Sequence, residues 1–393
     1  MSLSRWAAAL AVVLFTLSPL AGVAHRFLLL DNLGMPLLLG ALLAGCRLRQ
    51  STGGAAVAGA LLGAAVLVKE TNLLMVPVLA LLLAGRDETR QPSTGGPTWR
   101  RLAAAGAGLV AVAGAWPLYA LLRGELVAGR GEPSLLDGLH FQLIGRRGGG
   151  SVLDPSSERR QLLAHWLRLD PWLLGLGAAA GGAAAAVKRL RPVVLALAIL
   201  AAGLVRPGYL PAMYVTLALP FAALSVAGAA EWCWRRAAPR LRYGRPAAGA
   251  AALALAVAVL PGWLRSGVEL PTWQGERAYG RAVAWLADNV RPGEVILVDD
   301  GIWLDVVEAG FPAPSVVLSR ELDGQRPAWQ GTPADWRQVA YVVETPSLRR
   351  AARGPGGGEL AGTRRALAES TVVARVRSGG IAIDVRRLAD EAG

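Results

Sequence analysis

The feature that most constrains the fold is an apolar stretch from Gly53 to Gly85, broken by one short polar segment, Lys69–Asn72 (KETN). A single helix of this length would measure roughly 50 Å, whereas the hydrocarbon core of a bilayer is about 30 Å thick. The stretch therefore predicts two membrane segments, Gly53–Val68 and Leu73–Leu83, with the polar segment as a tight turn at one membrane face. Lys69 in that turn either snorkels from a helix end or is held at the surface to bind an anionic head group.

Apolar residues cluster in the same way along most of the chain. Of the 393 residues, 53% are hydrophobic and 18% are charged, a composition typical of an α-helical polytopic membrane protein. Segments shorter than a standard span are expected to be half-helices or tilted helices. We expect about 8–9 spans, within residues 6–24, 27–46, 54–68, 72–85, 102–122, 172–187, 193–205, 208–230 and 246–264.

The net charge of +13 is unevenly distributed. Residues 1–264 hold 25 Lys+Arg and 11 Asp+Glu, whereas residues 265–393 hold 16 and 17. The excess positive charge therefore belongs to the expected membrane domain, where short basic loops set orientation, and it does not indicate nucleic-acid binding. We expect a transmembrane domain at 1–264, with an outer loop at 123–171, and a C-terminal α/β domain at 265–393.

The basic loops alternate along the chain. If Arg5 is cytoplasmic, each short basic loop falls on the cytoplasmic side, as the positive-inside rule requires. The opposite side then carries Arg26, the Lys69 turn, the 123–171 loop, Arg206 and the C-terminal domain. This pattern predicts a multi-pass protein of the cytoplasmic (plasma) membrane with its C-terminal domain outside the cytoplasm.

The C-terminal domain shows alternating helix and strand patterns, which favour a small, partly parallel sheet. Expected strands are 294–300, 315–319 and 339–345, followed by a hairpin around Ser378–Gly380. The first of these strands ends in Asp299–Asp300. These carboxylates either cap the next helix or contact a metal ion or a ribose.

Three cations, Arg26, Lys69 and Arg206, are expected on the outer face. Phosphate binding requires a compact Lys charge or a forked Arg donor at head-group height, and snorkelling is the alternative role for each cation. Arg26 and Asp31 are about 140° apart on an ideal helix, so they are not expected to pair within it. Asp31 is either a helix cap or a site residue turned into a cavity. The cysteines offer no metal-ligand spacing, and no metal site is expected.

Several short motifs in order resemble glycosyltransferase family 39, in the C-type superfamily of polytopic sugar transferases. They are Arg26…Asp31-Asn32, Gly59…Gly63…Val68-Lys69-Glu70 and Arg206-x-x-Tyr209-Leu210-Pro211, with Val298-Asp299-Asp300…Trp303 in the tail. The resemblance implies inverting transfer of a hexosyl or pentosyl group from a polyprenyl-phosphate donor to an extracytoplasmic protein, glycan or lipid acceptor. It implies no required cofactor and leaves a divalent metal open. By analogy, Lys69 and Arg206, together with Arg26, would neutralise the lipid phosphate, and a carboxylate would deprotonate the acceptor hydroxyl.

The chain departs from the family at its start. Relatives begin with a further span and an outer loop that bears an acidic catalytic residue, whereas this chain begins about where their third span would. The usual base therefore has no counterpart, and the chain either lacks these N-terminal parts or uses Asp31 or Glu70 instead. The alternative to an enzyme is a truncated, non-catalytic protein of the same fold that binds or assembles lipid-linked glycans. A flippase would predict an inverted repeat, which the spans do not show.

Overall fold

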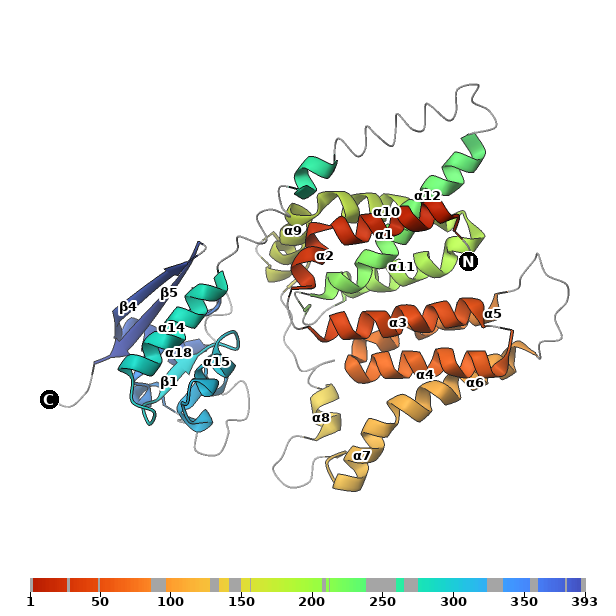
Figure 1. Cartoon of the computed structure of the whole chain (residues 1–393). Helices are drawn as coiled ribbons and strands as arrows, with labels where there is room; N and C mark the ends of the chain where they lie inside the picture. The colour runs from red at the N-terminus through yellow and green to blue at the C-terminus, as the bar shows by residue number, and fades with distance from the viewer. Residues whose placement is uncertain are drawn as a thin grey trace. The chain divides into compact units, whose positions relative to one another are not determined.

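The computed structural model divides the chain into two compact units, Met1–Leu270 and Pro271–Gly393 (Figure 1). The sequence placed this boundary after residue 264, and residues 265–274 lie outside the described part. The structure describes residues 3–26, 29–48, 50–85, 97–127, 134–140, 150–155, 157–206, 210–211, 213–237, 259–264, 275–323, 335–353, 360–378 and 380–389.

Unit 1 is built from helices that pack side by side (Figure 1). Apolar side chains from most of them form one buried core. A further short helical segment lies at residues 259–264. The helices are α1 (Arg5–Leu17), α2 (Pro19–Ala24), α3 (Leu30–Arg47), α4 (Thr52–Val68), η1 (Glu70–Met75), α5 (Val76–Ala84), α6 (Thr98–Ala113), α7 (Ala115–Arg123), α8 (Leu135–His140), α9 (Glu158–Leu169), α10 (Pro171–Ala185), η3 (Lys188–Leu190), α11 (Arg191–Val205), η4 (Tyr214–Ala218) and α12 (Leu219–Ala237).

The expected apolar spans coincide with helices in most places, but the count of eight to nine spans is not confirmed. By length and apolar composition, one helix among the described residues is able to cross a membrane, Tyr214–Arg236. A second qualifies if α6 and α7, which are bent by 40° at Gly114, form one span. The remaining apolar helices are shorter, and most of the span expected at 246–264 lies outside the described residues.

Glycines allow α4 and α6 to pack against each other in parallel. Gly59 faces Ala105, and Gly63 faces Leu109 one turn further along both helices. A Cβ atom on Gly59 would lie 1.9 Å from the Ala105 carbonyl oxygen, so only glycine permits this approach. Such spacing of small residues is typical of helix pairs within membranes.

Unit 2 is a five-stranded mixed sheet with strand order β2-β1-β3-β5-β4. β1 pairs in parallel with β2 and β3, and β5 pairs antiparallel with β3 and β4. The predicted small, partly parallel sheet is therefore present. The strands are β1 (Ile296–Val298), β2 (Val316–Leu318), β3 (Tyr341–Glu344), β4 (Ser370–Ser378) and β5 (Ile381–Leu388).

Helices cover both faces of this sheet. α14 (Gly275–Asn289) and α15 (Trp303–Glu308) share one buried cluster with the sheet. α16 (Ser319–Leu322), α17 (Pro346–Arg353) and α18 (Ala361–Ala368) pack on the opposite face. Each side of the sheet therefore has an apolar core of its own.

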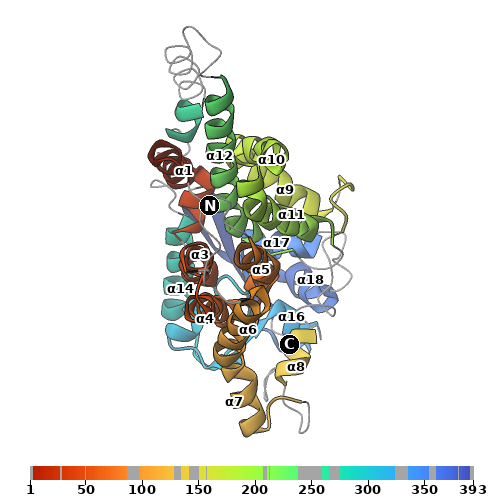
Figure 2. The same cartoon turned by 90° about the vertical axis from the view of Figure 1, so that its right-hand side faces the viewer.

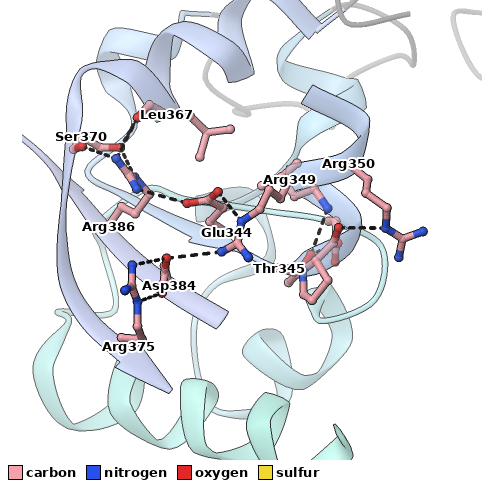
Figure 3. Close-up of polar contacts among 12 residues, drawn as sticks. Glu344, Thr345, Arg349, Arg350, Leu367, Ser370, Arg375, Asp384 and Arg386 are labelled. Carbon is pink, nitrogen blue, oxygen red and sulfur yellow. Dashed lines mark hydrogen bonds and ion pairs between the residues drawn. The ribbon is translucent and has the colours of Figure 1, made fainter. Parts of the chain in front are cut away.

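Buried carboxylates in unit 2 are neutralised by arginines (Figure 3). Glu344 accepts hydrogen bonds from Arg349 (2.7 Å) and Arg386 (3.1 Å). Asp384 accepts from Arg375 (2.7 Å) and Arg349 (3.3 Å). The hydrogen bond from Arg375, reinforced by the neighbouring positive charges, lowers the pKa of Asp384. The network joins β3, β4, β5 and α17.

The role predicted for Asp299 as a helix cap is wrong. The N-cap of α15 is Ile302, which makes no side-chain capping bond. Asp299 instead accepts hydrogen bonds from the Gly301 backbone N–H (3.0 Å) and from the Thr345 hydroxyl, which ties the end of β1 to the end of β3. Asp300 pairs with Arg320. Among the described residues, no three His, Cys, Asp or Glu side chains gather as metal ligands would.

Candidate functional site

The apolar stretch of α4 ends at Lys69, as the sequence predicts. Lys69 has an extended backbone conformation (φ −157°, ψ 120°), and the chain continues from Glu70 as the short helix η1. Asn72 is buried and donates from its side chain at 2.9 Å to the Ala65 carbonyl, which also accepts the Lys69 backbone N–H at 3.0 Å, so η1 is tied to the last turn of α4. Gly34 on α3 makes room for this amide, because a Cβ atom there would lie 2.9 Å from Asn72 Nδ2.

The Lys69 side chain forms an ion pair with Asp31. Its Nζ donates to Asp31 Oδ2 at 2.6 Å and to Oδ1 at 2.7 Å. The two side chains are 18% and 12% exposed, so the pair is partly sheltered from water. Asp31 lies in the first turn of α3, whose N-cap is Leu29, so it is not the helix cap. Its charge is favourable at this position because the N-terminus of a helix carries partial positive charge.

Glu70, the other proposed catalytic residue, does not share this pairing. It is exposed at the start of η1. Among the described residues, no ion pair joins it to Lys69, although the two are adjacent in sequence. The ammonium group of Lys69 instead reaches Asp31 on α3.

Arg26 and Arg206, the other predicted phosphate ligands, lie at the ends of other helices. Arg26 is exposed in the turn that follows α2. The neighbouring His25 ring contacts Asn32 Oδ1 at 3.0 Å, and the Asn32 amide donates to the Ala24 carbonyl at 3.0 Å. This turn is therefore fixed beside the start of α3, where Asp31 lies.

Arg206 follows the last residue of α11 and is exposed. Its backbone carbonyl accepts a hydrogen bond from the buried Arg159 on α9, which also donates to the Leu204 carbonyl at 2.9 Å. The C-terminal end of α11 is thereby tied to the second half of the predicted outer loop. The next residues of the predicted motif, 207–209, lie outside the described part of the chain.

A second buried carboxylate, Asp170, was missed as a candidate. It is fully buried and caps α10 by accepting from the Leu173 N–H at 2.9 Å. It also accepts from the Ser18 hydroxyl and from Trp263 Nε1 (3.2 Å). The Asp-Pro pair at 170–171 signals a helix start, but the other two partners are remote in sequence. With both oxygens engaged, Asp170 holds three segments of unit 1 together.

A third carboxylate, Glu231, marks the opposite end of unit 1. Its side chain accepts from Arg235 (2.7 Å), pairs with Arg189 (3.2 Å) and accepts from the Ser4 backbone N–H (3.3 Å). Ser4 precedes α1, which leads through α2 to the His25–Asn32 contact at the other end. The predicted basic loops around Arg189 and Arg235 therefore meet the N-terminus at one end of unit 1, and the Asp31–Lys69 pair lies at the other.

The comparison with known proteins gave a family match, which covers the part of the chain that contains the Asp31–Lys69 pair. No curated protein sequence and no solved structure gives a significant match. Residues 1–116, which include Arg26, Asp31, Lys69 and Glu70, match the family model described as Dolichyl-phosphate-mannose-protein mannosyltransferase.

Proposed function

We propose that this protein transfers a sugar, with inversion, from a polyprenyl-phosphate donor to an acceptor on the outer face of the cytoplasmic membrane. The observation that carries the proposal is the Asp31–Lys69 pair, which lies in the segment similar to the mannosyltransferase family. The pair lies at the end of unit 1 opposite to the one where Arg189 and Arg235 meet Glu231. Under the positive-inside rule the end with these arginines is cytoplasmic, which agrees with a site on the outer face.

The proposal depends on what Lys69 can offer to a phosphate. An ammonium group has three N–H donors, and Asp31 engages two of them in the present geometry. The third can donate to a phosphate oxygen of the donor lipid. As the sugar–phosphate bond breaks, negative charge grows on that phosphate, and a positioned ammonium stabilises it more strongly than it stabilises the ground state. Arg26 and Arg206 would add forked donors at the same membrane face.

The two carboxylates take different roles in this proposal. Both Asp31 oxygens lie within hydrogen-bond distance of Lys69 Nζ, which suits Asp31 to holding the ammonium in place. Glu70 is exposed and next to Lys69, which suits it to accepting the proton of the attacking hydroxyl. This assignment supplies a base within the chain as it stands.

A transfer assay with matched lysine variants tests the proposal. The full chain in nanodiscs is supplied with polyprenyl-phosphate mannose, labelled in the sugar, and a membrane extract as the acceptor source. The sequence contains two lysines, Lys69 and the exposed Lys188 at the other end of unit 1. We expect Lys69→Met to reduce transfer by roughly 10²-fold, the effect of losing one donor to a developing charge, and Lys188→Met to leave it unchanged.

Two results would count against the enzyme. Undiminished transfer by Lys69→Met would remove Lys69 from the site. Saturable binding of the donor without any release of sugar by the wild-type chain would favour the alternative, a protein that binds lipid-linked glycans without turning them over. A variant that lacks both partners, Asp31→Asn with Lys69→Met, avoids an uncompensated charge and shows whether loss of transfer reflects misfolding.

A further inference from the structure

One face of unit 2 is strongly basic. Arg350 and Arg353 on α17 and Arg364 and Arg365 on α18 are all exposed. Neither helix contains a carboxylate. α17 and α18 lie on the same side of the sheet, away from α14 (Figure 2). These four residues are called the arginine face.

The packing of the two helices forces these arginines outward. α17 buries Leu348 and Ala352, and α18 buries Thr363 and Ala366. Arg350, Arg353, Arg364 and Arg365 occupy positions on the exposed sides of these two short helices. The buried carboxylates of the sheet pair with Arg349 instead, which bonds Glu344 at 2.7 Å and Asp384 at 3.3 Å (Figure 3). The buried ion network inside unit 2 therefore does not use the arginine face, although Arg350 Nε also donates to the Pro346 carbonyl and the charge of Arg365 acts on the exposed Asp335.

The opposite side of the sheet has no such excess. α14 carries exposed Arg277 and Arg281, but its sequence also includes Glu276 and Asp288. α15 carries two acidic residues and no basic one. Among these helices, α17 and α18 thus carry the excess of positive charge, a distribution that orients this face toward a negatively charged partner.

We propose that the arginine face docks on the head groups of anionic phospholipids. Unit 2 follows unit 1 directly in the chain, so embedding unit 1 in a bilayer holds unit 2 close to lipid head groups at high effective concentration. A guanidinium group donates two parallel hydrogen bonds to a phosphate. Each arginine near an anionic surface strengthens association by about fivefold. The inference rests on unit 1 being a membrane domain and is independent of sugar transfer.

The test compares the full chain in nanodiscs of phosphatidylcholine alone and of phosphatidylcholine with phosphatidylglycerol. Hydrogen exchange is measured by mass spectrometry in peptides that cover α17 and α18, with α14 as the internal reference. We expect slower exchange of α17 and α18 only in the anionic nanodiscs, and loss of this protection at high salt.

Matched variants separate docking from a general charge effect. Arg350→Gln with Arg353→Gln should lower the ratio of docked to undocked unit 2 by roughly 25-fold, because each arginine that is removed lowers this ratio by about fivefold. The control, Arg277→Gln with Arg281→Gln on the opposite face, should retain the protection. Lys69→Met should retain it as well, so failure of docking is distinguishable from failure of transfer.

Three outcomes would overturn the proposal. They are equal exchange in the two lipid mixtures, equal loss of protection in the control variant, and protection by a soluble anionic polysaccharide but not by phosphatidylglycerol. The last result would assign the arginine face to an anionic glycan instead of the bilayer.

Discussion

Breaking the Asp31–Lys69 ion pair one partner at a time should reveal a strong energetic coupling between α3 and α4. A hydrogen bond to a charged group contributes roughly 1.5–3 kcal/mol, and the pair has two, at 2.6 and 2.7 Å. Partial exposure of both side chains weakens the interaction through solvent screening. We therefore expect a coupling free energy of about 2 kcal/mol.

The double variant should be destabilised by less than the two single variants added together. Asp31→Asn leaves a sheltered ammonium without its counter-ion, which costs about 3 kcal/mol. Lys69→Met leaves a sheltered carboxylate in the same condition. In Asp31→Asn with Lys69→Met neither charge remains, so the destabilisation should be smaller than the sum of the two single effects.

The assay is a double-mutant cycle on the full chain. SDS titration in mixed micelles yields the free energy of unfolding of the wild type, the two single variants and the double variant. A coupling below about 0.5 kcal/mol, the range seen for independent sites, would contradict the ion pair and with it the proposed positioning role of Asp31.

Further predictions concern helix packing, a buried cap and acid stability. Gly59→Ala should destabilise unit 1 by about 2 kcal/mol because its Cβ atom would meet the Ala105 carbonyl, whereas Gly106→Ala on α6, with nothing within 4 Å, should be neutral or stabilising in the same SDS titration. Asp170→Ala should cost about 3 kcal/mol by leaving the Trp263 N–H and the Ser18 hydroxyl without their partner; a thermal midpoint equal to that of the wild type would contradict this. Asp384 has a pKa below the ordinary value of 3.8, so its contribution to unit 2 is present above pH 3.8 and is lost as the pH falls through the lowered pKa. Tryptophan fluorescence during acid titration should therefore show Asp384→Asn less stable than the wild type near neutral pH and equal to it in strong acid; a gap that persists in strong acid would argue against the carboxylate charge as the cause.

Local sequence patterns predicted the structure well where a local cause determines it. The break at Lys69 follows from the length of an apolar stretch relative to the bilayer, and it lies where expected. The sheet of unit 2 was evident from short β-branched segments separated by turns. The bend at Gly114 was not predicted, because an uninterrupted apolar composition at 102–122 does not reveal a change of helix direction.

Contacts between segments that are distant in sequence were the part of the candidate site that the sequence did not predict. Lys69 and Asp31 were both singled out, yet their pairing was not predicted, because it depends on α3 and α4 packing as neighbours. Asp170 was overlooked for a similar reason: its partners Ser18 and Trp263 lie 152 and 93 residues away in sequence. A buried polar side chain gains its partners only through tertiary packing, which no local spacing encodes.

If Lys69 holds the phosphate of a lipid-linked sugar donor, a structure of the full chain with bound polyprenyl phosphate should show the two groups in contact. We expect a phosphate oxygen at about 2.7–2.9 Å from Lys69 Nζ, the range of a charge-assisted hydrogen bond, with Asp31 still in contact with the same ammonium group. A phosphate bound elsewhere on unit 1, with the Asp31–Lys69 pair unchanged and out of its reach, would show that Lys69 is not the phosphate ligand.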